Sequence, residues 1–569
     1  MSVMSPLPAS QTGPSSNPFA RYAGIFETLL FLAFWVAISA AVPDRLMRDP
    51  GTFWHTRIGL DILETGQLPQ SDTYTYTRAG TPWICQFWIC DLAMGGLYRL
   101  GGWTALLVVT AFVLAGTYAW LAGRFVAAGL DLVVTLLIVV LAIAVSAPQF
   151  HIRPLIFTIT FLGLELVLLA DVEAGRRRLV ELWWMVPMFI LWVNIHGGVI
   201  GGLASLALVT AGWLLLGLMR WDSPIRNLRD AGHLVAISLS CALTVLVNPY
   251  GLRMPQLWLD ILGLPLSEFV MEHAPLWHKP VMALPAVALL LVYLLFLFST
   301  SPRKWRATWL LPLVWFLLAC QRNRHAALFS VAVLAVLVDV LPQAGFSRLL
   351  QWRELYFPCA ADHRNGPPAW PRWALMGVLL LVALGLQGTG IPVPLLGADA
   401  VQLKPSYWPV ALLPELRELE KSPTTRLFNN DLNGGFLIFH TPGLPVFIDD
   451  RCELFGEQFL RRYFEIATKN PAKFDELDAE YHFTHALVKR RTPIDEWLRT
   501  NAHWKLLGET PSATLFEKVG PSQAAVAPAS WSYPRIRLVS PCYALVTELR
   551  QTKRVHRSMV SEDFSPRLK

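Results

Sequence analysis

Three ionisable side chains between the first two long apolar runs have the chemical types that proton transfer requires. Asp49 and His55 lie in the segment MRDPGTFWHTRIG, and Asp91 lies further on, in the segment PWICQFWICDLAMGG. A carboxylate or an imidazole can take a proton from a nucleophile. Trp54, beside His55, adds a flat ring that could stack on a ligand. We therefore interpret Asp49, His55 and Asp91 as candidate catalytic residues and Trp54 as a candidate binding residue.

Each of these residues also has a structural alternative. An Asp before a Pro commonly forms a turn or caps a helix, and Asp49 could have only that role. Trp54 and His55 could anchor the segment at a membrane surface, where tryptophan is common. Asp91 lies in a stretch with helical character, and it could make a structural hydrogen bond. The sequence alone leaves these alternatives open.

Long apolar runs dominate the rest of the chain. Of its 569 residues, 54% are hydrophobic and 16% are charged, and the mean hydropathy is +0.42. A water-soluble core cannot cover so many apolar stretches, which excludes a soluble globular protein. We predict a mainly α-helical polytopic membrane protein with about eleven transmembrane helices. The expected spans are 23–43, 103–123, 132–147, 155–170, 182–194, 199–219, 234–247, 284–299, 309–320, 326–341 and 373–391.

Basic residues indicate how these helices are oriented. With the N-terminus in the cytoplasm, clusters of Lys and Arg fall in the inner loops, as the positive-inside rule expects. These residues are Arg124, Arg176, Arg177, Arg178, Arg220, Arg226, Arg229, Arg303, Lys304, Arg306, Arg348, Arg353, Arg364 and Arg372. The clusters also account for the net charge of +7, so nucleic acid is not an expected partner. We predict a multi-pass protein of the inner membrane, with the loop 44–102 and everything after position 391 facing the periplasm.

Polar side chains recur at the outer ends of the expected helices. Because the spans themselves are nearly uncharged, this recurrence predicts a polar cavity that opens outward. A guanidinium group pairs well with phosphate oxygens, so Arg153, Arg322 and Arg324 are expected phosphate contacts. The alternatives are interfacial anchoring, helix capping and hydrogen bonds between helices. The candidate substrate-binding residues are Trp54, His151, Arg153, His196, Glu268, Arg322 and Arg324.

Composition divides the chain into four regions. We expect a cytoplasmic tail at 1–22, a transmembrane domain at 23–391, a periplasmic α/β domain at 392–520 and a partly ordered tail at 521–569. Within the third region, 405–421 resembles a polar helix with its linker, and RLFNNDLNGGFLIFHTPGLPVFIDD alternates apolar strands with Asn, Gly and Pro turns. Helices are also expected at 461–469 and 475–481, and strands at 484–488 and 513–518. Together they predict a mixed sheet covered by helices.

An acidic and basic patch stands out in this third region. Asp449, Asp450, Arg451 and Glu453 lie together in VFIDDRCELFG. We favour a structural role, in which the charges form ion pairs at the end of a strand packed on the membrane domain. The alternative is that the patch recognises an acceptor or closes over a donor.

The pattern of cysteines does not indicate a metal site. The chain has 7 cysteines with no CxxC pair and no His/Cys cluster at zinc spacing. Bridges among Cys85, Cys90, Cys452 and Cys542 could form in an oxidising compartment, but free thiols are favoured.

The first loop resembles a known family. DPGTFWHTRIG, LPQSD and TPWICQFWICDLAMGGLYRLGG are similar to the first outward loop of GT-C membrane glycosyltransferases, which include protein O-mannosyltransferases, lipid A aminoarabinose transferases and oligosaccharyltransferases. The resemblance covers most of the membrane part. It implies a polyprenyl-phosphate-linked sugar donor and a catalytic carboxylate at Asp49. Family members often have two acidic residues close together here, whereas Asp49 is flanked by Arg48 and Pro50.

This departure weakens the case for a metal. A divalent cation such as Mg²⁺ or Mn²⁺ would need a second carboxylate brought close by folding, for example Asp91 beside Asp49. No cofactor is therefore assigned with certainty.

The function predicted from these observations is sugar transfer at the outer face of the inner membrane. The expected donor is a lipid-linked sugar, and the acceptor is an envelope glycan, lipid or protein. Membrane lipids are further expected partners. The alternatives are a transporter or flippase for lipid-linked sugars, which binds phosphate without breaking a bond, and a scaffold without catalytic activity.

Overall fold

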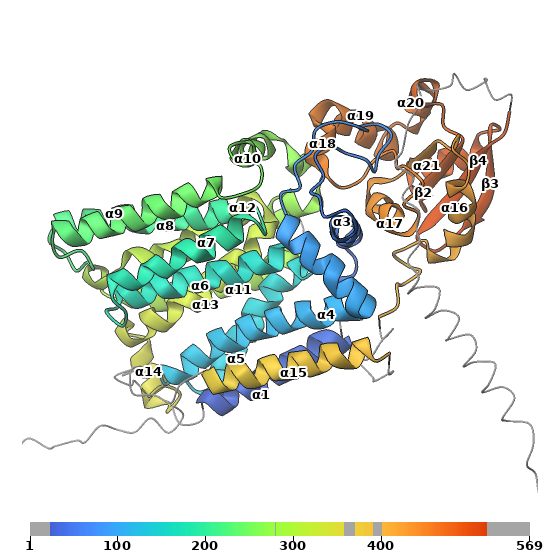
Figure 1. Cartoon of the computed structure of the whole chain (residues 1–569). Coiled ribbons are helices and arrows are strands. Elements are labelled where there is room, and N and C mark those ends of the chain that lie inside the picture. Colours follow the sequence, from blue (N-terminus) through green and yellow to red (C-terminus); the bar gives the residue numbers. More distant parts are fainter. Residues whose placement is uncertain (1–22, 42, 279, 358–369, 391–400, 521–569) are drawn as a thin grey trace, which may run out of the picture. The chain divides into compact units, whose positions relative to one another are not determined.

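Each apolar segment expected from the sequence forms a helix in the structure. The structure is a computed structural model that describes residues 23–41, 43–278, 280–357, 370–390 and 401–520 (Figure 1). The apolar helices are α1 (Ala23–Ala41), α4 (Trp88–Ala127), α5 (Leu132–Ser146), α6 (Leu155–Glu173), α7 (Met185–Val193), α8 (Val199–Leu218), α9 (Leu228–Leu243), α11 (Pro280–Phe298), α12 (Leu311–Gln321), α13 (Ala326–Val340) and α15 (Trp370–Gly388).

Seven of these helices are long and apolar enough to cross a membrane: α4, α5, α6, α8, α9, α13 and α15, some of them counted with an adjoining 3-10 turn. The other four are shorter apolar helices. Helix α13 is the most enclosed, because every residue from Ala326 to Val340 is buried. Four further helices connect the bundle: α2 (Pro43–Leu46), α3 (Gly51–Thr65), α10 (Arg253–Gly263) and α14 (Ser347–Trp352).

An ion cluster marks the end of the bundle away from the first loop. Arg124 and Arg176 both pair with Asp171, each at 2.6 Å, and Arg176 also contacts Asp339. Asp339 lies near the C-terminal end of α13, whereas Arg324 precedes the N-terminal end of the same helix. The arginines expected on the inner and outer sides thus lie at opposite ends of α13.

Helix α3, the first half of the long loop, packs tightly on α4. A Cβ atom added to Gly59 would lie 1.8 Å from the backbone oxygen of Asp91, and one added to Gly95 would lie 2.4 Å from the carbonyl carbon of Gly59. The two backbones can approach so closely only because both positions are glycine. Helix α4 itself bends at Gly101 and Gly102, whose backbone angles are not helical.

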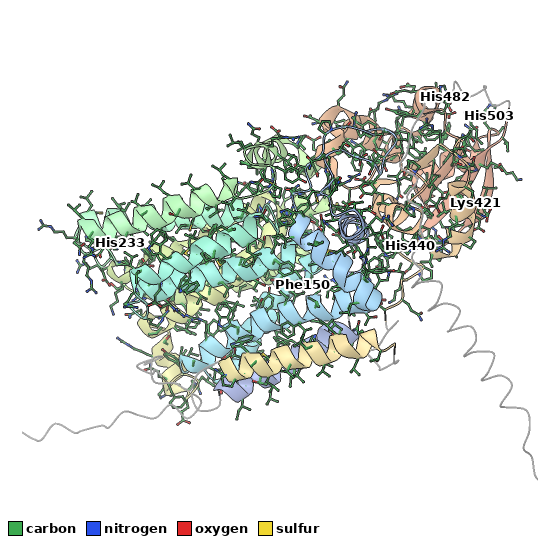
Figure 2. The ribbon with its side chains drawn as sticks, viewed as in Figure 1. Phe150, His233, Lys421, His440, His482 and His503 are labelled. Atoms are coloured by element: carbon green, nitrogen blue, oxygen red, sulfur yellow. The ribbon has the colours of Figure 1, made fainter. Side chains whose placement is uncertain are left out.

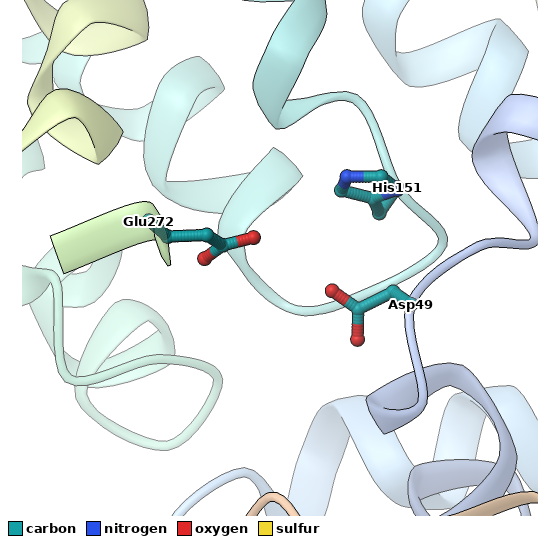
Figure 3. A group of neighbouring side chains, drawn as sticks. All are labelled: Asp49, His151 and Glu272. Carbon is teal, nitrogen blue, oxygen red and sulfur yellow. The ribbon is translucent and has the colours of Figure 1, made fainter. Parts of the chain in front are cut away.

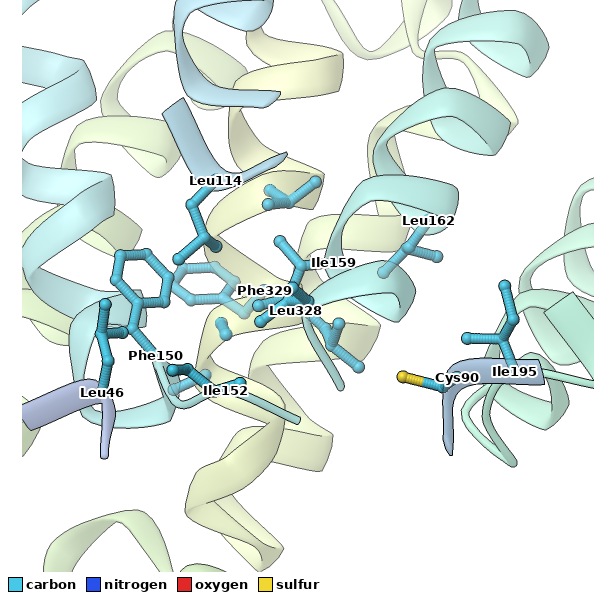
Figure 4. Packing of buried hydrophobic residues seen from close by; sticks show 14 of the residues in the cluster. Leu46, Cys90, Leu114, Phe150, Ile152, Ile159, Leu162, Ile195, Leu328 and Phe329 are labelled. Atoms are coloured by element: carbon cyan, nitrogen blue, oxygen red, sulfur yellow. The ribbon is translucent and has the colours of Figure 1, made fainter. Parts of the chain in front are cut away.

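Buried apolar side chains support the outer end of the bundle. Leu46 precedes Asp49 in the first loop, while Phe150 and Ile152 lie between α5 and α6 (Figure 4). All three belong to the same buried cluster as Leu114 and Phe329. The loops that carry Asp49 and Arg153 are therefore anchored in a packed core.

The C-terminal domain contains a four-stranded mixed sheet, as expected. Strands β1 (Leu427–Asn429), β2 (His485–Lys489), β3 (Trp504–Glu509) and β4 (Ala513–Lys518) have the order β1-β2-β4-β3. Only β1 and β2 are parallel, with Phe428 opposite Ala486. The helices of this domain are α16 (Leu413–Glu420), α17 (Asp431–His440), α18 (Cys452–Phe455), α19 (Glu457–Thr468), α20 (Phe474–Tyr481) and α21 (Pro493–Thr500).

Two details of this domain differ from the expectation. The sequence DLNGGFLIFH forms helix α17 rather than a strand, and VFIDD contributes only an isolated bridge between Val446 and Thr75. Glycines in DLNGGFLIFH suggested a turn, but a Cβ atom added to Gly434 would lie 2.4 Å from the backbone oxygen of Ile448, and one added to Gly435 would lie 2.2 Å from that of Pro50. They are therefore close-packing positions of a helix. The regions 1–22 and 521–569, for which we expected tails, lie outside the described residues.

The second half of the first loop joins the C-terminal domain. Thr77 donates a hydrogen bond to the carbonyl of Phe447 at 2.7 Å, and the Tyr76 hydroxyl donates to that of Leu427 at 3.1 Å. Arg78 donates to the carbonyl of Phe455 at 2.7 Å. Helix α3 lies between α4 and α17 (Figure 1). The loop therefore connects the helical bundle to the sheet domain.

Candidate active site

A pocket of about 140 Å³ lies where the first loop, the helix ends that carry Arg153, His196 and Arg324, and the C-terminal domain meet. Six of the candidate catalytic and substrate-binding residues line it, namely Asp49, Trp54, His55, Arg153, His196 and Arg324. The remaining lining residues are Gly51, Gln86, Phe87, Pro154, Leu155, Asp450, Arg451 and Glu453. A polar cavity is therefore present at this end of the bundle, and its opening to the outer side of the membrane stays a prediction.

Backbone hydrogen bonds between two loops position Asp49. The Ile152 N–H donates to the carbonyl of Leu46 at 3.0 Å, and the Thr52 hydroxyl donates to the carbonyl of Ile152 at 2.9 Å. Asp49 uses Oδ1 to accept from the Gly51 N–H at 2.8 Å, which is the local turn that its position before Pro50 suggested. Its Oδ2 accepts from Arg153 at 2.8 Å. Asp49 thus makes both a local turn with Gly51 and an ion pair with Arg153.

His55 is oriented by Asp91. Nδ1 of His55 lies 2.6 Å from Oδ1 of Asp91, and the thiol of Cys85 donates to Oδ2 of Asp91 at 3.1 Å. Asp91 is fully buried, and these two contacts occupy both of its carboxylate oxygens. It is not among the residues that line the pocket. A carboxylate on Nδ1 leaves Nε2 of the imidazole to act on a ligand. Asp91 is therefore a positioning residue rather than the second carboxylate beside Asp49.

Three side chains converge on Gly51. A Cβ atom at this position would lie 2.6 Å from Oδ1 of Asp49, 3.4 Å from the His55 ring and 3.6 Å from Oδ2 of Asp450. Oδ1 of Asp450 accepts from the indole N–H of Trp54 at 2.9 Å. Burial, followed by the charges of Asp49 and Asp449, raises the pKa of Asp450 well above its usual range. Two carboxyl groups and one imidazole therefore share this part of the pocket.

Arg153 holds two acidic side chains at the pocket. Besides Asp49, it pairs with Glu272 at 2.8 Å, and it donates to Gln149 at 2.9 Å. Burial opposes ionisation of Glu272, but the charges of Arg153 and Arg324 outweigh it and lower the pKa of Glu272 to about 2. Glu272 was one of several polar residues at the outer helix ends in the sequence, and it joins the site through this ion pair.

Arg324 is the pocket-lining arginine without an acidic partner. Its Nη1 lies 2.8 Å from Nε2 of His273, and no carboxylate among the described residues forms an ion pair with it. Burial and the neighbouring Arg324 and Arg322 lower the pKa of His273 to about 2, so the ring is neutral and accepts from the guanidinium. Arg324 therefore remains available to an anion.

His196 offers a hydrogen-bond donor to the pocket. Its Nδ1 accepts from the Gly198 N–H at 2.9 Å, and the ring lies against Phe87 with 5.6 Å between ring centroids. Burial, together with Arg324 and Arg153, lowers the pKa of His196 well below its usual value. The neutral ring accepts at Nδ1 and thus carries its proton on Nε2.

One cluster has the donor atoms of a metal site. Ligand atoms of Asp49, His151 and Glu272 lie within 4.8 Å of one another (Figure 3). Nδ1 of His151 contacts the carbonyl of Arg45 at 3.1 Å, the second-sphere bond that commonly fixes a ligating imidazole through its other nitrogen. Two carboxylates and an imidazole fit a divalent cation such as Mn²⁺. However, Arg153 already supplies a positive charge between these carboxylates.

Three predicted contacts, His151, Glu268 and Arg322, are not among the pocket-lining residues, and His151 lies instead in the cluster with Asp49 and Glu272. Glu268 is exposed and pairs with Arg461 on α19, while Arg322 precedes α13 without lining the pocket. Gln86 and Phe87 do line it, although no pattern in the sequence distinguished them from a connecting turn. Other histidines, such as His233 on α9 and His440, His482 and His503 in the C-terminal domain, lie elsewhere (Figure 2).

The cysteines in the described part of the chain are free thiols. Cys85 and Cys90 are buried, and Cys452 is unpaired as well. Burial, with the charge of Asp91, raises the pKa of Cys85 well above its usual range, so this thiol stays protonated and donates to Asp91. Cys542 lies outside the described residues.

Known structures provide a comparison. The archaeal oligosaccharyltransferase AglB from Archaeoglobus fulgidus, solved with an inhibitory peptide and a dolichol-phosphate, is 12% identical, with a TM-score of 0.46 over 83% of this chain and 70% of AglB. ArnT from Cupriavidus metallidurans, solved with undecaprenyl phosphate, is 14% identical, with a TM-score of 0.38 over 88% of this chain and 99% of ArnT.

The chain is thus similar in structure to AglB and to ArnT, at low sequence identity. No family model and no curated protein sequence matches the chain.

Proposed function

We propose that this protein is a membrane glycosyltransferase that moves a sugar from a polyprenyl-phosphate donor to an envelope glycan, lipid or protein. The observation that carries the proposal is the pocket itself. It places an oriented imidazole, His55, and a carboxylate, Asp49, together with the guanidinium of Arg324 at the outer helix ends. A base beside an anion-binding cation is what transfer from a sugar phosphate requires.

In the proposed reaction, a hydroxyl oxygen of the acceptor attacks the anomeric carbon of the sugar. The bond between that carbon and the phosphate oxygen breaks, and its electron pair leaves with the polyprenyl phosphate. The acceptor proton moves to Nε2 of His55, while Asp91 stabilises the resulting imidazolium. Arg324 holds the departing phosphate. The configuration at the anomeric carbon is inverted.

The role of Asp49 differs from the one expected from the sequence. We expected Asp49 to take the proton, but Arg153 and the Gly51 N–H already engage its two oxygens. His55 is the better placed base, because its partner Asp91 orients the ring. Asp49 instead keeps Arg153 in place and sets a negative charge near the sugar carbon, where positive charge develops in the transition state.

A divalent cation fits this proposal without being required by it. Asp49, His151 and Glu272 would hold the ion. When bound, it would supply positive charge to the phosphate oxygens. Binding would also require Arg153 to release at least one carboxylate, because it pairs with both Asp49 and Glu272.

Profiling lipids and glycans in a strain that lacks the protein tests the function. Loss of a transferase leaves its donor accumulated and its acceptor without the sugar, which identifies both. Complementation by the wild type restores the product, and complementation by His55→Gln, at equal protein level in the membrane, does not. If the His55→Gln variant restores the glycan as well as the wild type does, the pocket is not a transferase site.

A further inference from the structure

One wall of the pocket comes from the C-terminal domain. Asp450, Arg451 and Glu453 line it, and they lie in the segment between α17 and α19. The sequence favoured a purely structural role for this patch. In the structure, ion pairs engage only part of the patch.

Arg451 is fixed by a buried ion triad. Its Nη2 pairs with Asp449 at 2.6 Å and with Asp72 of the first loop at 2.7 Å, and all three side chains are inaccessible to solvent. The guanidinium also lies over the rings of Trp83 and Trp54, at 4.8 and 6.0 Å from the ring centroids. The triad therefore gives a structural role to Asp449, to Asp72 and to most of the guanidinium group of Arg451.

One donor of Arg451 is left over. Its Nη1 is buried and has no hydrogen-bond partner among the described residues. Buried donors in folded proteins are nearly always bonded, so an orphaned guanidinium nitrogen on the wall of a polar pocket indicates a ligand acceptor there.

Asp450 has similar free capacity. Oδ1 accepts from Trp54, and no Lys or Arg of the described residues forms an ion pair with this carboxyl group. Trp54 and Phe87, which also line the pocket, have flat apolar rings. Carboxyl oxygens, a guanidinium N–H and aromatic rings together match the alternating hydroxyl groups and apolar C–H faces of a sugar ring.

Charge separates this wall from the rest of the pocket. Arg324 and Arg153 come from the outer helix ends, whereas the two acidic side chains Asp450 and Glu453 come from the C-terminal domain. The guanidinium groups of Arg324 and Arg153 attract phosphate, whereas the carboxyl groups do not, so the anionic part of a donor belongs on the arginine side.

We propose that Asp450, Arg451 and Glu453 form a subsite that binds the sugar of the lipid-linked donor, so that the C-terminal domain selects which sugar is transferred. This inference rests on the proposed function, because it requires a donor whose phosphate lies at Arg324. The lipid and phosphate are recognised by the membrane part, and the sugar hydroxyls by the C-terminal domain.

Binding of two lipids to the purified full-length protein tests the subsite. The probes are bare undecaprenyl phosphate and undecaprenyl phosphate carrying glucose, mannose or galactose. We expect the wild type to bind at least one sugar-bearing lipid about tenfold more tightly than the bare lipid, since about 1.4 kcal/mol of added hydrogen bonding corresponds to this factor. Asp450→Asn and Glu453→Gln should remove this preference and leave the affinity for bare undecaprenyl phosphate within about twofold.

The controls separate the two proposals. Glu457→Gln, an exposed position on α19, should behave as the wild type. Arg324→Ala should weaken binding of every lipid equally. The subsite is overturned if no sugar increases the affinity, or if Asp450→Asn and Glu453→Gln keep the preference or weaken both kinds of lipid alike. If the wild type fails to bind undecaprenyl phosphate with or without sugar, the proposed function itself fails.

Discussion

At the scale of single residues, the contact between His55 and Asp91 determines how the pocket can move a proton. Asp91→Asn removes the acceptor that orients the ring, so we expect the turnover number to fall by about 10²- to 10⁴-fold while KM for the donor lipid stays nearly unchanged. Cys85→Ser, which retains a hydrogen-bond donor to Asp91, should stay close to wild type. Initial rates with the donor purified from the deletion strain measure both. Equal turnover in the Asp91→Asn variant and the wild type would rule out the assigned base.

The pair of Arg153 with Glu272 predicts a pH dependence of stability. Because the pKa of Glu272 is lowered to about 2 in the folded protein, the pair stabilises the fold above the ordinary pKa of 4.5 and loses this effect as the pH falls towards 2. In detergent and with a chelator present, Tm should fall between about pH 5 and about pH 3. Glu272→Gln should lower Tm near neutral pH and flatten the decline in that acidic range. An equally steep decline in the variant would contradict the assignment.

Several individual residues could be predicted from the sequence and others could not. Asp49 and His55 stood out because their side chains can take a proton, and Arg324 stood out because a guanidinium group pairs well with phosphate oxygens. The contact of Asp91 with His55 depends on how two helices pack, which a sequence pattern does not specify. Glu268 and Glu272 are four residues apart in one loop, and the sequence offered no reason to prefer Glu272.

At the scale of elements, the close approach of α3 and α4 sets the geometry of the site. His55 precedes Gly59 by one helical turn, and Asp91 precedes Gly95 by the same spacing, so the glycine contact brings the two side chains together. The contact between His55 on α3 and Asp91 on α4 therefore depends on two residues without side chains, Gly59 and Gly95.

Gly95→Ala tests this dependence. The new methyl group would meet backbone atoms of Gly59, which cannot move aside without separating the helices, so we expect a loss of stability of about 1–3 kcal/mol together with reduced activity. Gly96→Ala is the matched control, because a Cβ atom there meets nothing within 4 Å. Thermal unfolding and transfer rates of the two variants provide the comparison. Similar losses in both variants would show that helix propensity, and not the contact, is responsible.

Hydrophobic patterns predicted the elements well where they were long. Each expected apolar run is a helix, because apolar residues of that length have few other ways to satisfy their backbone in a membrane. Shorter segments of the C-terminal domain were harder. DLNGGFLIFH combines a turn-like start with an apolar end, and only its packing against Pro50 and Ile448 explains the helix. Helix α21 and strand β3 were not anticipated.

At the scale of the whole molecule, the pocket exists only where the first loop and the C-terminal domain meet. Arg451 and Asp72 form an ion pair although 379 positions separate them in the chain. A sequence pattern cannot reveal such a contact. The patch around Asp450 was interpreted as structural because its own charges can form ion pairs at the end of a strand.

The buried pair makes the two parts of the protein dependent on each other. Asp72→Asn leaves part of the charge of Arg451 unbalanced in a site without solvent, so we expect a loss of about 3–5 kcal/mol and faster proteolysis between the domains. The exposed pair of Glu268 with Arg461 links the same two parts of the protein. Glu268→Gln breaks this pair and should have little effect on stability. Limited proteolysis and Tm distinguish the outcomes, and an unaffected Asp72→Asn variant would show that other contacts hold the domains together.

The central claim is that the pocket breaks the bond between a sugar and a lipid phosphate. The direct measurement uses the protein reconstituted in liposomes with the donor lipid from the deletion strain, labelled in its sugar, and with the acceptor from the same strain. The account predicts that labelled sugar appears on the acceptor, that undecaprenyl phosphate or its equivalent is released in equal amount, and that His55→Gln prevents both. Label that stays attached to its lipid, whether it is merely bound or moved across the bilayer, would contradict the account and indicate a transporter or a scaffold instead.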